Sequence, residues 1–177
     1  VTIALSATTA DVTLSADSVT LTENNWSDGV EVTVSAVDDR IADGDTNLTL
    51  QTAPVTGGDP VYGGMNPADV TVTVTDNDVA GVVVSPTELR LSEPDTQGVV
   101  TFRLQSEPAT PVTIPLSIEN DEATVYPNEV TLDGETWDKG VVAIVTAADD
   151  ADVDGEQPSR LITGSILSGD APYAGMD

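Results

Sequence analysis

The chain has 177 residues, of which 31 are acidic and 5 are basic, so its formal net charge is −26 at pH 7. This balance excludes nucleic acid as a partner, because phosphate binding needs clustered Lys and Arg side chains. The chain has no His and no Cys, which excludes disulfides, His- or Cys-based catalytic triads and His-ligated zinc. We therefore expect a protein that is not an enzyme.

The composition favours strands over helices. Val and Thr are frequent, aromatic residues make up only 3% of the chain, and no segment repeats apolar residues at the spacing of a helix face. β-Branched residues suit the pleated, half-buried surface of a sheet. We expect an all-β protein with thin cores of Val, Leu, Ile and Ala, and its length suits two small domains.

Short segments in which apolar and polar residues alternate run along the chain, separated by Gly, Pro, Asn and Asp. This alternation is typical of strands with one buried face. The predicted strands are, in chain order, residues 30–34, 70–74, 82–91, 99–104, 111–118, 123–126, 130–132, 141–146 and 160–167. Such a series predicts two-sheet antiparallel sandwiches of immunoglobulin-like type.

One unit of the sequence is repeated. Residues 1–66 align without gaps with residues 112–177, at an offset of 111 positions, and about 25 of the 66 aligned positions are identical. Trp26 aligns with Trp137, and Tyr62 aligns with Tyr173. We predict two tandem domains, residues 1–78 and 79–177, that are both truncated: the first lacks its first strands and the second lacks its last strand.

Acidic residues gather just beyond predicted strands, where side chains from several loops can converge. They occupy positions in 38–45 and 76–78 of the first copy and in 149–156 of the second. Glu93 stands at the end of the first predicted strand of the second unit, residues 82–91. Two like charges about 4 Å apart repel by about 4 kcal/mol at an effective dielectric constant near 20, and Ca²⁺ suits loops dense in carboxylates. Two other interpretations stay open: a solvated acidic surface, and Asp-Gly turns that bind nothing.

Three motifs, two of them acidic and one around Trp26, resemble those of the Calx-β family, the calcium-binding sandwich domains of sodium/calcium exchangers, integrin β4 and many large bacterial surface proteins. Residues 36–43 (AVDDRIAD) are similar to the acidic loop of the family, and residues 72–78 (VTVTDND) to its final strand and acidic end. Residues 20–26 (TLTENNW) are similar to a stretch found in bacterial members, which Thr131, Leu132 and Trp137 repeat. The resemblance covers essentially the whole chain.

The resemblance implies which carboxylates bind calcium. In the family the ligands are paired loop aspartates, an acidic residue shortly after them, the terminal acidic triplet and a Glu on the first strand. Carried over by position, the metal ligands are Asp38, Asp39, Asp43, Asp76 and Asp78 in the first unit and Glu93, Asp149, Asp150 and Asp154 in the second. Asn77 and Ala151 replace acidic residues of the family pattern, so we expect one Ca²⁺ per unit. Asp11 and Glu122, at matching positions between strands, are secondary candidates.

The function expected from these observations is mechanical. We expect a calcium-binding structural repeat of a large extracellular surface, adhesin or filament protein, in which Ca²⁺ stiffens the loops and the junctions between repeats. The expected partners are calcium and neighbouring repeats of the same protein, with self-assembly into a filament through exchanged or added strands as a special case. No apolar run is long enough to span a membrane.

The alternative is a carbohydrate- or protein-recognition module that displays a binding surface. Tyr62 and Tyr173 lie beside Gly-rich turns, where an aromatic ring can stack on a sugar. We favour the other interpretation of these positions, a tyrosine packed at a turn between strands. We likewise expect Trp26 and Trp137 to cover the cores rather than to bind a ligand.

Overall fold

The computed structural model describes residues 1–150 and 155–176. Within these residues all regular structure is strand and turn, and every strand pairing is antiparallel. The predicted all-β class is therefore confirmed. No helix in this part of the chain has the length and apolar character that crossing a bilayer requires.

The chain divides into two compact units, which we describe separately. The first contains Val1–Asp39 and Gly44–Asp76, and the second contains Arg40–Asp43 and Asn77–Asp177.

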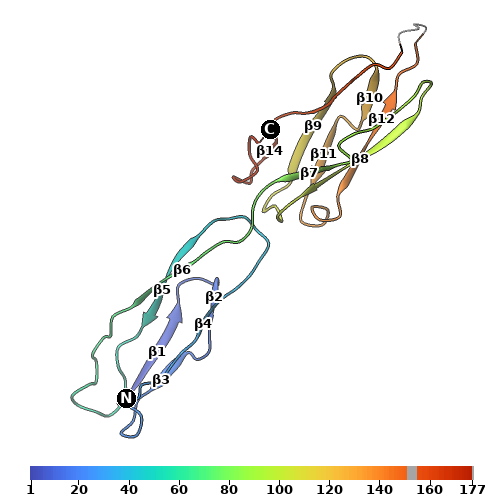
Figure 1. Cartoon of the computed structure of the whole chain (residues 1–177). Helices are drawn as coiled ribbons and strands as arrows, with labels where there is room; N and C mark the ends of the chain where they lie inside the picture. The colour runs from blue at the N-terminus through green and yellow to red at the C-terminus, as the bar shows by residue number, and fades with distance from the viewer. Residues whose placement is uncertain (151–154, 177) are drawn as a thin grey trace. The chain divides into compact units, whose positions relative to one another are not determined.

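The first unit has a four-stranded and a two-stranded sheet (Figure 1). In the larger sheet the strand order is β3-β1-β5-β6, and β2 pairs with β4 in the smaller one. The strands are β1 (Thr2–Ala7), β2 (Val12–Leu14), β3 (Ser18–Thr20), β4 (Val34–Ala36), β5 (Thr46–Thr52) and β6 (Val70–Val74).

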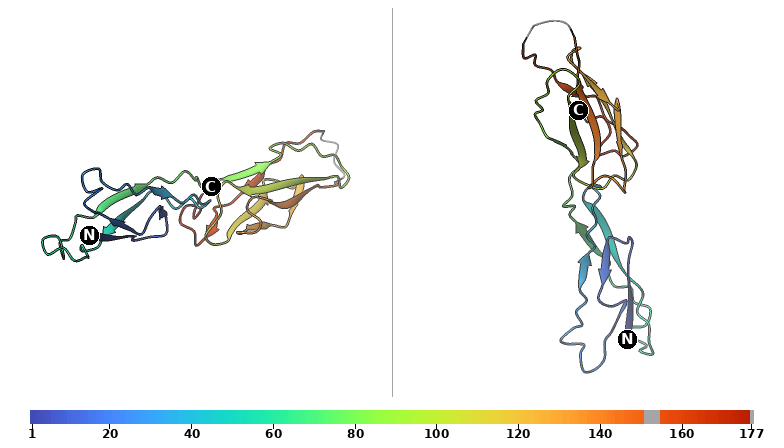
Figure 2. Two further views of the ribbon diagram at one scale, coloured as in Figure 1. Left: turned by 90° about the horizontal axis from the view of Figure 1, so that it is seen from below. Right: turned by 90° about the vertical axis from the view of Figure 1, so that its right-hand side faces the viewer.

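The second unit has two sheets that face each other (Figure 2). One has the order β10-β12-β8-β7, and the other has the order β11-β9-β13 with β14 also paired to β9. The strands are β7 (Val82–Ser85), β8 (Gln97–Leu104), β9 (Val112–Ile118), β10 (Ala123–Tyr126), β11 (Glu129–Leu132), β12 (Val141–Ala147), β13 (Leu161–Thr163) and β14 (Leu167–Ser168).

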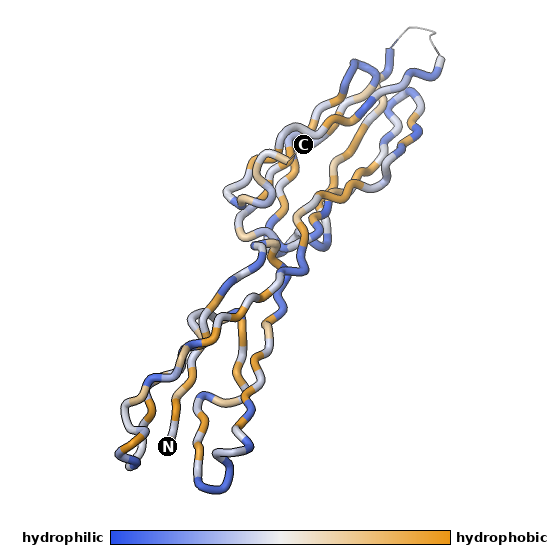
Figure 3. The backbone as a smooth tube through the Cα atoms, turned by 60° about the vertical axis from the view of Figure 1, so that its left-hand side comes forward, coloured by the Kyte–Doolittle hydropathy of each residue, from blue (hydrophilic) through white to orange (hydrophobic). Residues whose placement is uncertain are grey.

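The main core lies between these two sheets of the second unit. Buried and less buried residues alternate along β8, β9, β11 and β12, so each of these strands turns one row of side chains inward. Hydrophobic and hydrophilic stretches follow one another along the chain (Figure 3). Phe102 on β8 and Ile114 on β9 belong to this core and are 0% and 1% exposed. The other buried members are mainly aliphatic: Val100, Leu104, Val112, Leu116, Val130, Leu132, Ala143, Val145, Ile166 and Tyr173. The second unit is thus an all-β, sandwich-like fold with an aliphatic core.

Three strand predictions differ from the structure by more than two residues. The strand predicted over residues 82–91 ends at Ser85, because Pro86 has no N–H to donate to a ladder. The strand predicted over 160–167 is divided into β13 and β14 at Gly164, whose N–H donates to the Pro115 carbonyl over 2.9 Å. The strand predicted over 30–34 is instead β4, at Val34–Ala36.

The two units pair their strands in the same register at an offset of 111 residues. The β1–β3 pairing recurs as β9–β11, the β1–β5 pairing as β9–β13, and the β2–β4 pairing as β10–β12. Corresponding pairs are Thr2↔Thr20 and Thr113↔Thr131, Leu5↔Thr52 and Leu116↔Thr163, and Val12↔Ala36 and Ala123↔Ala147. A residue of the first unit can therefore be compared directly with its counterpart in the second.

Candidate metal site

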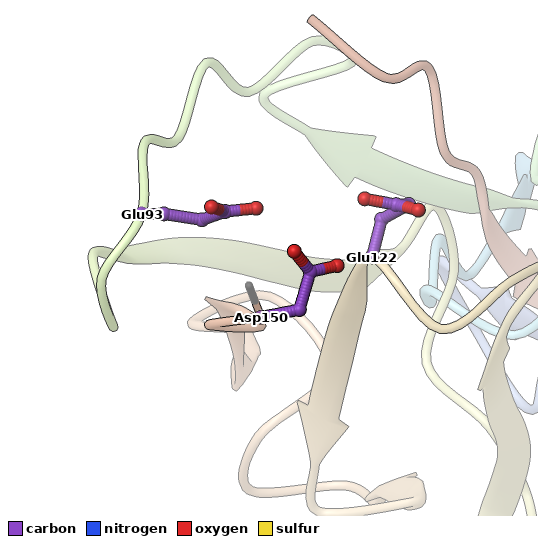
Figure 4. A group of neighbouring side chains, drawn as sticks. All are labelled: Glu93, Glu122 and Asp150. Carbon is purple, nitrogen blue, oxygen red and sulfur yellow. The ribbon is translucent and has the colours of Figure 1, made fainter. Parts of the chain in front are cut away.

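The carboxylates of Glu93, Glu122 and Asp150 come together in the second unit. One oxygen from each residue lies within 4.8 Å of an oxygen from each of the others. Figure 4 shows the three side chains converging from separate parts of the chain. Two of the four ligands predicted for this unit, Glu93 and Asp150, are thus brought together by the fold.

Glu93 is positioned by the short loop that precedes β8. The hydroxyl of Thr96 accepts a hydrogen bond from the Ser92 N–H at 2.6 Å and donates to the Ser92 carbonyl, which closes the loop around Glu93. The Thr96 carbonyl accepts a hydrogen bond from the N–H of Ala147 at 2.9 Å, so the loop is attached to the end of β12.

Glu122 precedes β10 and is attached to the same end of β12. Its N–H donates to the Asn120 side-chain oxygen at 3.3 Å, and its carbonyl accepts a hydrogen bond from the N–H of Ala148 at 2.9 Å. Glu122 is half-buried, whereas Glu93 and Asp150 are exposed. It is therefore the innermost carboxylate of the three.

Asp150 lies three residues beyond Ala147, where β12 ends. Because Ala147 and Ala148 hold the loops of Glu93 and Glu122 through adjacent backbone bonds, the segment leaving β12 passes beside both carboxylates. The site is thus built at one strand end, from residues that are far apart in the sequence.

The sequence predicts Glu122 only as a secondary candidate. Its signal was the acidic residue at the matching position of the first unit, Asp11, whose carbonyl likewise accepts a hydrogen bond from the backbone N–H of Val37 at 2.8 Å. Asp149, also predicted, is exposed and is not among the three grouped carboxylates. Asp154 lies outside the described residues.

The five ligands predicted for the first unit do not all fall in one unit. Asp38, Asp39 and Asp76 belong to the first unit, whereas Asp43 and Asp78 belong to the second. The five predicted carboxylates are therefore divided between the two units.

Asp76 has hydrogen bonds of its own within the first unit. Its carboxylate accepts a hydrogen bond from the N–H of Gly44 at 2.7 Å, and its N–H donates to the carboxylate of Asp45 at 3.0 Å. These bonds fasten the turn before β5 to the end of β6, which is a structural role for Asp76.

The grouped carboxylates can hold a divalent cation. Ca²⁺ takes six to eight oxygen ligands at about 2.3–2.6 Å, so two oxygens bound to one ion are separated by at most about 5 Å. The separation limit of 4.8 Å in this group meets that requirement. The chain has no His or Cys, so oxygen atoms are the ligands available to a metal.

Comparison with family models, curated proteins and solved structures found no match to the chain. The resemblance to the Calx-β family accordingly rests on the sequence motifs and stays a prediction.

Proposed function

We propose that this chain is a non-catalytic, calcium-binding structural segment of a large extracellular surface, adhesin or filament protein. The observation that carries the proposal is the convergence of Glu93, Glu122 and Asp150 within 4.8 Å in a chain of net charge −26. Like charges brought this close repel one another, and a bound cation removes that cost.

Calcium fits this group better than other common metals. Thiolate and imidazole ligands, which favour zinc and copper, do not occur in the chain. Magnesium demands near-octahedral geometry and keeps several waters, whereas calcium accepts irregular geometry from flexible loops. Backbone carbonyls or water would supply the oxygens that three carboxylates leave open.

A cation here would act mechanically, because it would join three segments that meet at the end of β12. The loop of Glu93 and the loop of Glu122 are held to Ala147 and Ala148 by one backbone bond each. An ion shared with Asp150 would add a third connection and would oppose fraying of the strand ends. Extracellular calcium modules work at dissociation constants of about 10⁻⁴–10⁻³ M, which suits exposed ligands such as Glu93 and Asp150.

The recognition alternative is weaker, because one of the two tyrosines that it would place against a sugar is buried. Tyr173 is 1% exposed and its hydroxyl bonds to Ser106, so this ring is part of the core and does not face a sugar. Tyr62 is exposed.

The test is calcium-dependent thermal unfolding of the full chain at constant ionic strength. We expect Ca²⁺ to raise the melting temperature and to slow hydrogen exchange in residues 92–96, 119–122 and 147–150, because a ligand that binds only the folded state stabilises it. Glu122→Gln should abolish both effects. The matched control is Asp11→Asn, which alters the counterpart of Glu122 in the first unit and should leave exchange in these three segments responsive to Ca²⁺.

Equal melting curves in chelator and in millimolar Ca²⁺ would overturn the proposal. So would a response of the same size to Na⁺ at matched ionic strength, because general screening of the acidic surface would then explain the stabilisation.

A further inference from the structure

Several residues of the first unit are exposed although their counterparts, 111 positions later, are buried. Tyr62 is 54% exposed, whereas Tyr173 is 1% exposed. Trp26 is 71% exposed, whereas Trp137 packs against the core of the second unit. Aromatic side chains so exposed on one unit and covered on the other mark a surface that lacks a covering element.

The second unit shows what covers these positions. Phe102 and Leu104 of β8 lie in the same buried cluster as Tyr173, and Trp137 packs against that cluster. The N–H of Leu104 donates to the Trp137 carbonyl at 2.9 Å. Just beyond β8, the Tyr173 hydroxyl donates to the Ser106 carbonyl at 2.7 Å and accepts from its N–H at 3.2 Å. β8 and the residues after it thus contact the Tyr173 hydroxyl and the Trp137 backbone, and β8 supplies part of the cluster against which both aromatic side chains pack.

The backbone of β4 also differs from that of its counterpart, β12, in the length of the strand. In the second unit, β12 pairs with β8 from Val141 to Thr146 and with β10 only from Ile144 onward. The counterparts of 141–144 are residues 30–33, which are not strand, and β4 is limited to Val34–Ala36. Residues 141–143, the portion of β12 that pairs with β8 alone, thus correspond to residues 30–32, and none of these three is strand in the first unit.

A glycine at this edge shows how closely the covering strand approaches. At Gly140, an added Cβ would lie 2.7 Å from the Thr101 side chain and 3.0 Å from the Phe102 carbonyl. At Gly29, its counterpart, nothing lies within 4 Å. The space that β8 fills beside Gly140 is open beside Gly29.

We infer that this surface of the first unit, formed by residues 30–36 with Trp26 and Tyr62, binds an antiparallel β-hairpin with the chemistry of β7–β8. The occupant would pair with residues 30–35 as β8 pairs with 141–146. It would insert apolar side chains at alternate positions, as β8 does with Val100, Phe102 and Leu104, and would follow them with a backbone group for the Tyr62 hydroxyl. Strand addition of this kind takes affinity from backbone bonds and specificity from the alternate side chains. The inference is independent of calcium.

The repeat makes a direct experiment possible. Residue 111 precedes Val112, the counterpart of Val1, so a second copy of residues 79–111 placed directly before Val1 presents the hairpin in register. The full chain with this extension is compared with a matched extension carrying Val100→Ser, Phe102→Ser and Leu104→Ser in the added copy only. Both are made with Trp137→Phe, so that Trp26 is the fluorophore observed.

With the native extension, we expect the emission of Trp26 to shift to the blue and its acrylamide quenching to fall to the value of Trp137. Tyr62→Phe should then destabilise the first unit with the native extension and have no effect with the matched control. Equal Trp26 quenching in the two extended chains, together with no effect of Tyr62→Phe in either, would overturn the inference. If the unextended chain is a dimer that the native extension makes monomeric, the site is supported and the occupant is the hairpin of a second copy.

Discussion

Ile3 and Ile114 hold the same position in the two units and have different surroundings. Each lies on an interior strand of its sheet, β1 or β9, and each faces a Val across the ladder, Val19 for Ile3 and Val130 for Ile114. Ile114 is 1% exposed, whereas Ile3 is only half-buried. Identical residues in identical register thus differ in how completely they are removed from water.

The difference comes from the opposing sheet. In the second unit, β7 and β8 extend the sheet of β10 and β12, and their inward side chains close over β9 and β11. In the first unit, the corresponding sheet consists of β2 and β4 alone. Strand register is therefore set by neighbouring strands and their turns, whereas core burial depends on a second layer.

The largest effect expected from this comparison is on core truncation. Ile114→Ala should destabilise the second unit by about 2–5 kcal/mol, because the loss of buried methyl groups also leaves a cavity. Ile3→Ala should cost the first unit about 1 kcal/mol, since its surroundings are already partly hydrated.

Urea unfolding checks this prediction in two backgrounds. With Trp26→Phe, the remaining Trp137 reports on the second unit, and with Trp137→Phe, Trp26 reports on the first. Equal losses of stability for Ile3→Ala and Ile114→Ala would mean that the two cores are closed to the same degree, contrary to the comparison.

The second comparison concerns one hydroxyl group. Tyr173→Phe removes the group that bonds to the buried Ser106, whose polar atoms are then left without this partner, at a cost of about 1–3 kcal/mol. Tyr62→Phe changes an exposed side chain and should alter stability by less than about 0.5 kcal/mol. The same two fluorescence backgrounds measure both changes, and a loss for Tyr62→Phe as large as that for Tyr173→Phe would contradict the difference in burial.

Local patterns predicted much of the fold. The strands at Val70–Val74 and Ala123–Tyr126 were predicted to the residue, because alternation and adjacent turn residues are local signals. Residues 30–33 have the same alternation and are not strand, since strand formation there depends on a partner elsewhere. Alternation of apolar and polar residues in a segment does not show whether a second strand is available to pair with it.

The candidate site was predicted in part for a similar reason. Glu93 and Asp150 stood at ends of predicted strands, where carboxylates were expected to converge. Glu122 joins them because its carbonyl bonds to Ala148, 26 residues away along the chain. Such a pairing between distant segments has no local pattern, and only the acidic counterpart Asp11 pointed to it.

The third comparison lies in the turn that contains each Trp. In the second unit, Asp133 accepts hydrogen bonds from the Thr136 hydroxyl at 2.8 Å and from the N–H of Glu135 at 3.0 Å. These bonds, led by that of Thr136, hold the pKa of Asp133 below its usual 3.8. The corresponding turn of the first unit uses Thr22 and Asn25, with the Thr22 N–H donating to the Asn25 side-chain oxygen at 2.7 Å, and neither residue titrates.

The smallest expected effect follows from that ionisable group. Because the pKa of Asp133 is lower in the folded chain, its charge stabilises the fold fully above about pH 3.8, and this contribution is lost as the pH falls through the folded pKa. Asp133→Asn keeps a side-chain oxygen but cannot titrate. The difference in melting temperature between the native chain and Asp133→Asn, followed by Trp137 fluorescence, should therefore be constant from about pH 6 to pH 4 and shrink towards about pH 2.5. A difference that stays constant or grows over the acidic range would show that the charge of Asp133 does not distinguish this turn from that of Thr22 and Asn25.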